Sequence, residues 1–259
     1  MSHLQGCLCP QHLLQGLVSQ GQRDNQRELH QVSIMSALMD GVYEGEMTLA
    51  ELFGKGDFGL GTFNGLDGEL IAFDGEAFQL RSDGSARPAT GDQKTPYAVV
   101  TFFEPQLTLT VDSPVSRRAL HHDIDEQIGS ANVFCAIRID GHFNRVKTRT
   151  VVRQVPPFRP FTEAVKQQPI FDFSHATGTL VGFRSPDFIQ GIGVAGYHEH
   201  FITEQRQGGG HVIDYHLQQG SVQFGIISRL VVHFPKGEDF RHANLTPAFL
   251  DRDIRRAEH

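Results

Sequence analysis

The stretch Tyr197-His198-Glu199-His200-Phe201, with Gly208-Gly209-Gly210-His211 shortly after it, is the most informative part of this 259-residue chain. Side chains two residues apart on a strand point to the same face of a sheet, so His198 and His200 can converge on one point. The three glycines let the backbone turn tightly. A returning strand would set His211 opposite the first two histidines. The stretch therefore predicts a strand, a glycine turn and a second strand.

The three histidines of this stretch also suggest a metal site. Three neutral imidazoles and one open position are the ligand set of a catalytic zinc ion, whereas structural zinc sites are closed by four ligands, often cysteines. The three cysteines, Cys7, Cys9 and Cys135, all lie outside the stretch. The chain has 14 histidines, so a His-x-His pair can also arise by chance. We interpret the following histidines as ordinary surface or core residues: His121, His122, His142, His175, His216, His233 and His242.

Composition and charge exclude several classes of protein. The formal net charge of -7 argues against a nucleic-acid-binding surface, which is usually basic. No stretch has membrane-spanning length, and residues 13–18 are too short and too interrupted for a secretory signal. We therefore expect a cytoplasmic enzyme with reduced thiols, and Cys7-Leu8-Cys9 as two unremarkable thiols.

Short β-branched or aromatic runs, separated by Gly or Asp, predict strands in the first half of the chain. These runs are residues 58–64, 69–73, 77–80, 98–103, 107–111, 133–139 and 146–152. The spacing of apolar residues over 32–39 predicts a helix, and Thr48-Leu49-Ala50-Glu51 has the capping-box pattern of a second helix. Ser113-Pro114 predicts the start of a helix of about a dozen residues.

Residues 154–160 contain three prolines and cannot continue a sheet, so we interpret them as a linker or crossing segment. Beyond it we expect a short helix at 162–166, and strands at 171–175, 178–183, 194–203, 211–217 and 222–234. Thr246-Pro247 opens a C-terminal helix that runs to Glu258. The chain is therefore predicted to be α+β (mixed α/β): two sheet-containing units packed together, with short helices and a C-terminal helix.

The predicted organisation has three parts. Residues 1–28 form a loosely ordered N-terminal extension. Residues 29–154 form a first β-rich α/β unit, and residues 155–259 form a second β-rich unit that carries the three histidines.

Four pieces of the chain together resemble acetolactate decarboxylase. They are the run from Gly54 to Glu69 (GKGDFGLGTFNGLDGE), Arg149, Gly196-Tyr197-His198-Glu199-His200-Phe201, and Gly209-Gly210-His211. The resemblance covers the chain from about Gln31 to Glu258. It implies a homodimeric zinc enzyme with a two-domain α/β fold. Such an enzyme converts 2-acetolactate to acetoin and carbon dioxide, in the route to butanediol.

The resemblance also implies a set of site residues. His198, His200 and His211 match the zinc ligands, and Glu69, Arg149 and Glu258 match the acidic and basic positions of the active site. Thr62 matches a residue near the site and is expected to contact the substrate. Without the family, local pattern favours surface roles for the two glutamates and for the arginine.

The reaction can be argued from its chemistry. The ketone and hydroxyl oxygens of acetolactate are adjacent and could chelate one zinc ion, which would act as a Lewis acid and hold the resulting enediolate. Glu69 or Glu258 would deliver a proton to this intermediate if its surroundings raised its pKa. Arg149 would hold the substrate carboxylate through two parallel hydrogen bonds.

Two other functions remain open at this point. A cupin-like metal protein would use His198, His200 and Glu204 as ligands, with iron or manganese as the metal. In that case the next histidine would normally come much further along the chain than His211. A non-enzymatic small-molecule-binding domain of α+β build would need no metal at all.

Overall fold

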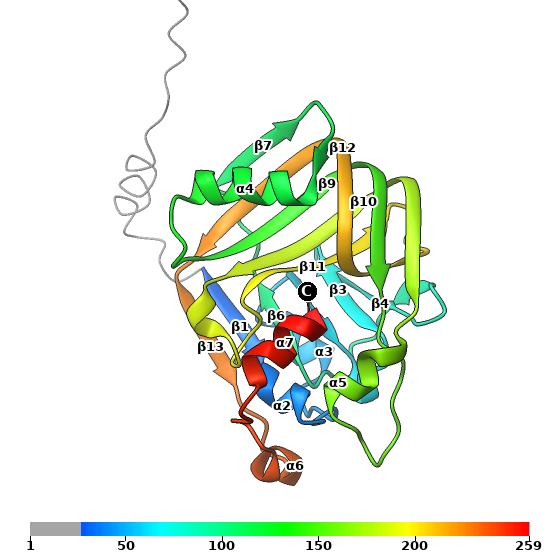
Figure 1. The fold of residues 1–259 in the computed structure, drawn as a ribbon, viewed down its shortest axis with the longest axis vertical. Helices are drawn as coiled ribbons and strands as arrows, with labels where there is room; N and C mark the ends of the chain where they lie inside the picture. Colours follow the sequence, from blue (N-terminus) through cyan, green and yellow to red (C-terminus); the bar gives the residue numbers. More distant parts are fainter. Residues whose placement is uncertain (1–26, 259) are drawn as a thin grey trace, which may run out of the picture.

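The computed structural model describes residues 27–258, which form two β-sheets with helices around them (Figure 1). Most of the predicted extension at residues 1–28, with Cys7 and Cys9, lies outside the described residues. The predicted α+β class is confirmed. Over the described range, no helix has the length and apolar character needed to cross a membrane.

The first sheet has seven strands in the order β13-β1-β6-β2-β3-β4-β5. They are β1 (Glu28–Val32), β2 (Phe58–Thr62), β3 (Glu69–Phe73), β4 (Glu76–Leu80), β5 (Ala86–Pro88), β6 (Ala98–Thr101) and β13 (Arg229–His233). Every residue of β2 and β3 is buried. This follows because the second sheet packs on one face of these strands and helix α3 (Leu49–Phe53) packs on the other.

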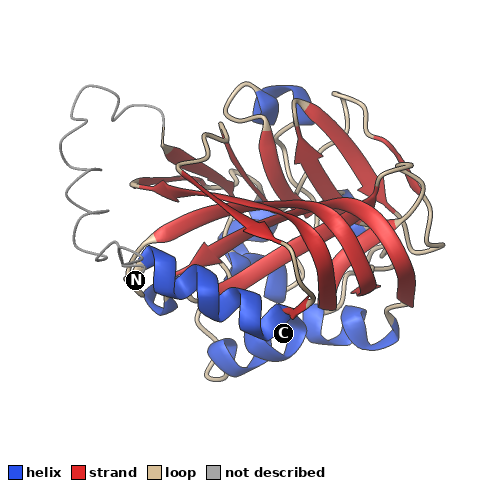
Figure 2. Cartoon of the chain, turned by 90° about the horizontal axis from the view of Figure 1, so that it is seen from above, coloured by secondary structure: helices blue, strands red, loops and turns tan. Residues whose placement is uncertain are grey.

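The second sheet has the strand order β11-β10-β9-β12-β7, and β8 also pairs with β12. Its strands are β7 (Leu107–Val111), β8 (Val115–Ser116), β9 (Phe134–Arg149), β10 (Ile170–Ser185), β11 (Gly196–Thr203) and β12 (Gly209–Ile227). Since β11 pairs with β12 as well as with β10, the strands β11, β10, β9 and β12 close into a ring. Figure 2 shows the curvature of these long strands.

Long strands replace pairs of predicted short ones. β9 joins the runs predicted at 133–139 and 146–152, β10 joins 171–175 and 178–183, and β12 joins 211–217 to the start of 222–234. Gly141 lies inside β9 without ending it, since it is paired with Gly178 on one side and Gly220 on the other. Glycines aligned in this way allow strands to bend while they stay paired.

The two sheets exchange strands across the proline-rich segment. β7, β8 and β9 precede residues 154–160 yet belong to the second sheet, and β13 follows them yet belongs to the first. The division into units at 29–154 and 155–259 stays a prediction about domains. The segment 154–160 itself contains no strand.

The helices are short, apart from α4. They are α2 (Met35–Met39), α3, α4 (Arg117–Ile128), α5 (Phe161–Ala164), α6 (Glu238–His242) and α7 (Leu250–Glu258), with 3-10 turns η2 (Asn64–Leu66), η3 (Val165–Gln167) and η4 (Asp187–Ile189). The capping box at Thr48 and Glu51 is confirmed. Three helix starts were predicted wrongly: Val32 belongs to β1, Ser116 instead of Ser113 caps α4, and α7 begins at Leu250 instead of Thr246.

The helices pack against the sheets in two places. α4 lies across the outer face of the second sheet and packs its apolar side against it (Figure 1). α2, α5 and α7 share a separate apolar cluster that includes Tyr97 and Val151. The end of α7 thereby reaches the region between β3 and β11 (Figure 1).

Candidate active site

The predicted strand–turn–strand unit is present, and it brings the three histidines together. β11 and β12 are antiparallel, and His211 lies directly opposite His200. The glycines are required by close packing as well as by the turn. A Cβ on Gly209 would lie 2.1 Å from the carbonyl oxygen of Phe201, and one on Gly210 would lie 2.6 Å from that of Arg149.

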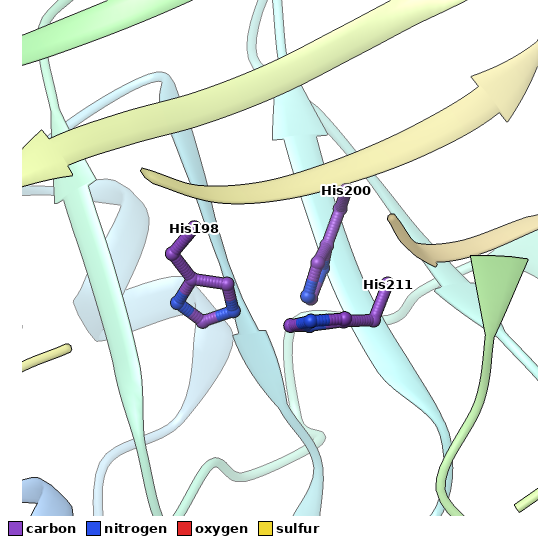
Figure 3. Close-up of side chains that lie close together, drawn as sticks. All are labelled: His198, His200 and His211. Atoms are coloured by element: carbon purple, nitrogen blue, oxygen red, sulfur yellow. The ribbon is translucent and has the colours of Figure 1, made fainter. Parts of the chain in front are cut away.

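The imidazoles of His198, His200 and His211 form a group that could hold a metal ion. Their ligand atoms all lie within 4.8 Å of one another. Figure 3 shows the three rings gathered from the two strands, and the ring centroids are 5.0 to 5.4 Å apart. Nδ1–H of His200 donates to the carbonyl oxygen of Leu70 over 2.7 Å, which leaves its Nε2 with a lone pair. That Nε2 is buried and has no hydrogen-bond partner, as expected for an atom placed to bind a cation.

Burial keeps two of these histidines neutral. The pKa of His200 is lowered to about 4, chiefly by burial; the hydrogen bond to Leu70 opposes this shift, and the charge of Arg149 contributes to it. Burial, followed by Arg149, also holds the pKa of His211 well below its usual value. Neutral imidazole is the form that binds metal ions, so no proton has to leave these rings near neutral pH.

Glu69 lies at the start of β3, on the first sheet, and its carboxyl group points into the histidine cluster. Oε2 is 3.8 Å from Nε2 of His200, and Oε1 accepts from the backbone N–H of Val151 over 3.1 Å. Burial raises the pKa of Glu69 to about 8, and the charge of Glu258 adds to this, while Val151 and Arg149 oppose it.

Glu258 reaches the same cluster from the end of α7. Its Oε2 lies 3.6 Å from Nε2 of His198 and 3.9 Å from Nδ1 of His211. Burial raises its pKa to about 7, although Arg149 opposes the shift. Local pattern favoured a surface residue near a chain end, but the carboxyl group is 8% exposed.

Arg149 and Thr62 add two more polar side chains to the site. Arg149 is paired with His211 across β9 and β12, and its Nη2 donates to the carbonyl oxygen of Ala257 and lies 3.2 Å from Nε2 of His211. Thr62 is paired with Glu69 across β2 and β3. Its hydroxyl donates to the carbonyl oxygen of Gly68 over 2.7 Å, so the hydroxyl oxygen can accept a bond from a ligand.

All of these side chains except His200 line one cavity of about 30 Å³. The polar side chain of Gln168 also lines it, and most of the remaining wall is apolar: Met35, Leu38, Leu66, Tyr97, Val151 and Phe161. Sequence reasoning missed them because apolar residues in strands and helices have the pattern of core residues. It also missed the backbone groups of Leu70 and Val151, which carry no side-chain signal.

A second buried polar group lies on the opposite face of β11. Glu199 accepts hydrogen bonds from Arg117 and His121 of α4, so His121 is a partly buried residue of this group. Glu204 is exposed in the turn after β11 and contributes nothing to the histidine group. The cupin-like ligand set is therefore wrong, because the third position belongs to His211.

Comparisons with known proteins agree with this site. A sequence model of the family described as alpha-acetolactate decarboxylase matches residues 29–247. The alpha-acetolactate decarboxylase of Raoultella terrigena is 53% identical over 259 residues and is covered completely, as is this chain. That of Bacillus subtilis (strain 168) is 46% identical over 243 residues, 93% of this chain and 95% of the relative.

Solved structures agree as well. The crystal structure of alpha-acetolactate decarboxylase from Bacillus subtilis strain 168 has a TM-score of 0.88 and 46% identity, covering 89% of this chain and 99% of that one. A Staphylococcus aureus protein of unknown function, similar to alpha-acetolactate decarboxylase, has a TM-score of 0.86 at 32% identity, covering 89% of this chain and 100% of that one.

The fold and the buried site thus define an enzyme of the decarboxylase class. The chain belongs to the alpha-acetolactate decarboxylase family. A non-enzymatic binding domain is therefore also wrong.

Proposed function

We propose that this enzyme uses zinc to convert 2-acetolactate to acetoin and carbon dioxide. The observation that carries the proposal is the partnerless, buried Nε2 of His200 within a group of three histidines, next to two buried carboxyl groups. His198, His200 and His211 would hold the ion. Zinc takes three nitrogen ligands of this kind and leaves a fourth position for substrate. When bound, it supplies a Lewis acid next to the ketone and hydroxyl oxygens.

Arg149 is proposed to bind the carboxylate that leaves as carbon dioxide. Its guanidinium is the cation that lines the cavity, and it can form two parallel hydrogen bonds to a carboxylate. A contact made only to the ground state would lower KM without lowering the barrier. We therefore infer that Arg149 orients the bond to be broken, while its bond to the carbonyl oxygen of Ala257 keeps the guanidinium in place.

Glu69 is proposed to be the acid that protonates the enediolate after carbon dioxide has left. The pair of electrons from the broken C–C bond is then used to form a C–H bond with this proton. Both carboxyl groups have raised pKa values, about 8 for Glu69 and about 7 for Glu258. Because they share one site, they should titrate as a coupled pair that retains a proton near neutral pH in the metal-free protein, whereas a bound cation lowers both pKa values. Glu69 lies on a fully buried strand and is the more rigidly placed of the two.

Thr62 is proposed to contact the substrate hydroxyl. Its own proton is engaged by Gly68, so its oxygen can accept the hydrogen bond of a tertiary alcohol. The apolar side chains of the cavity wall suit the methyl groups of 2-acetolactate.

The decisive test measures acetoin formed from 2-acetolactate by the purified protein, before and after treatment with a chelator. We expect activity and one zinc ion per chain, loss of activity on chelation, and recovery when zinc is added. His198→Ala and His200→Ala should lose most of the metal, whereas His122→Ala, at an exposed position, should keep it. Full zinc occupancy in both ligand variants would contradict the assignment.

The family resemblance also leads us to propose a homodimer, located in the cytoplasm and acting in the route to butanediol. Sedimentation equilibrium on the purified protein tests the assembly. A mass of one chain, 28.8 kDa, at micromolar concentration would contradict the dimer.

A further inference from the structure

We infer that Glu199 is a positioning residue, which holds the metal-binding histidines in place from the opposite side of their strand. The inference rests on the proposed metal site. Glu199 lies between His198 and His200 on β11, so its side chain leaves the other face of the strand and points toward α4.

Both oxygens of the Glu199 carboxylate are bound by side chains of α4. Oε2 accepts from Nε of Arg117 over 2.7 Å, and Oε1 accepts from Nε2 of His121 over 2.9 Å. The carboxylate is 1% exposed. The Glu199 side chain is therefore held at both of its oxygens, directly behind the histidine cluster.

Tyr197, on the other side of His198, is held by the same helix. Its ring stacks on that of His121, with centroids 3.6 Å apart and planes 6° apart. Its hydroxyl lies 3.0 Å from the carbonyl oxygen of His121 and 3.0 Å from Oδ1 of Asp125. The two residues that flank His198 thus share one support, the middle of α4.

Arg117 extends this support to the strand of the third histidine. Its Nη1 donates to the carbonyl oxygen of Ile213 over 3.4 Å, two residues beyond His211 on β12. A single guanidinium therefore bonds to both strands that carry the proposed ligands.

The backbone alone gives β11 weaker support where this group lies. Pairing with β10 runs along the whole strand, from Gly196 to Thr203. Pairing with β12 covers only His200 to Ile202. The first half of β11 is therefore paired on one side only. There, side chains of α4 supply hydrogen bonds to Glu199 and Tyr197 in addition to the backbone pairing with β10.

A buried ion pair is a costly way to attach a helix, because well-packed apolar residues of similar size are often as stabilising or more so. The ion pair has the advantage that a guanidinium binds a carboxylate in a fixed geometry. Apolar contacts, in contrast, allow a helix to shift along the strand that it covers. The three ligand atoms lie within 4.8 Å of one another, so a small shift of β11 would change the distances between them.

The test compares Glu199→Gln with Ile124→Ala, a matched control in the apolar side of the same helix. Both variants weaken the attachment of α4, but only the first removes a directional contact to β11. The measurements are the Zn²⁺ dissociation constant, by competition with a chelating dye, the visible absorption spectrum of the Co²⁺-loaded protein, and the unfolding temperature.

We expect Glu199→Gln to bind Zn²⁺ about tenfold more weakly, at the lower end of the range for supporting residues of metal sites. Its Co²⁺ spectrum should also differ from that of the wild type. Ile124→Ala should lower the unfolding temperature at least as much as Glu199→Gln does. Its affinity for Zn²⁺ and its Co²⁺ spectrum should equal those of the wild type. Wild-type affinity and spectrum in Glu199→Gln would overturn the inference and leave Glu199 as an anchor of the helix only.

If Glu199→Gln does not fold, the variant Arg117→Lys tests the same inference. It keeps the charge but loses the bridge between β11 and β12, so weaker Zn²⁺ binding supports the inference and unchanged binding overturns it. The wild-type protein separates this inference from the proposed function. If the wild type binds neither Zn²⁺ nor Co²⁺, the metal site itself is wrong.

Discussion

Glu69 has an N–H donor on one carboxyl oxygen and a histidine near the other, in a buried position. If it is the acid, Glu69→Gln should keep its zinc and lose about a hundredfold or more in kcat, the usual scale for a positioned acid. Turnover and zinc content are measured together. Glu76→Gln is the matched control, since Glu76 is exposed on the neighbouring strand β4. Near-normal turnover in Glu69→Gln would mean that another group delivers the proton.

The raised pKa of Glu69 also predicts how the metal-free protein responds to pH. The folded carboxyl has a pKa of about 8 against an ordinary value of 4.5, so between these values the folded state keeps a proton that the unfolded chain has lost. Stability therefore falls as pH rises through this window. His200, with a pKa lowered from 6.5 to about 4, has the opposite effect: it lowers stability as the pH falls below 6.5.

The measurement is the unfolding temperature of metal-free protein between about pH 6.5 and 8.5. The wild type should lose stability over this range, and Glu69→Gln should lose clearly less, with a remainder from Glu258, whose pKa is raised to about 7. If the unfolding temperatures of the two proteins change with pH in the same way, Glu69 is not the cause of the pH dependence.

The residues of the site differ in how far the sequence could predict them. The spacing of His198, His200 and His211 pointed to a metal site directly, because strand alternation and a glycine turn are local properties. Glu69 and Arg149 could be assigned only by resemblance to a family, since their partners are far away in the sequence. The support from Arg117 was not predicted at all, because a helix residue 82 positions before Glu199 gives no local sign of the contact.

At the scale of elements, the end of α7 contacts the site through side-chain and backbone groups, among them the carbonyl oxygen of Glu258, which lies 3.1 Å from Nε2 of His211. Glu258 faces His198 and His211, and the carbonyl oxygen of Ala257 accepts from Arg149. A chain that ends after Arg256 should lose at least about a hundredfold in kcat, since it lacks one carboxyl group and the acceptor that holds the guanidinium. Its unfolding temperature should change little, because Ile254 still packs in the cluster shared with α2 and α5.

Glu258→Gln is the companion to the shortened chain, because it keeps the backbone acceptor of Arg149. The activity of Glu258→Gln should be higher than that of the shortened chain and lower than that of the wild type. Unchanged activity in the shortened chain would show that the end of α7 is not needed for the reaction.

Most strands were predicted from local pattern, and the errors have a common cause. Residues 69–73 and 107–111 are strands with the predicted limits. β9 and β12 were each divided into two, because glycine and polar residues inside them were interpreted as turns. A long strand that bends within a ring tolerates such residues, and a local pattern does not show which strands will pair around it.

At the scale of the whole molecule, the proposed metal ion would bind where the two sheets and α7 meet. A ligand that binds only the folded state stabilises it by about 2.7 kcal/mol at a free concentration 100 times its Kd. For a chain of this size that corresponds to about 5 to 10 °C in unfolding temperature. Differential scanning calorimetry with and without a chelator measures the shift. No shift in wild-type protein, despite loss of bound zinc, would mean that the ion does not stabilise the junction.

The strand–turn–strand unit has a consequence for the order of events in folding. Its three histidines lie within 14 residues of one another, from His198 to His211, whereas Glu69 and Glu258 come from parts of the chain far away in sequence. Contacts close in sequence form early, because little loop entropy is lost in closing them. A zinc ion could therefore hold the β11–β12 hairpin together before the remaining elements arrive, and refolding should be faster when zinc is present from the start.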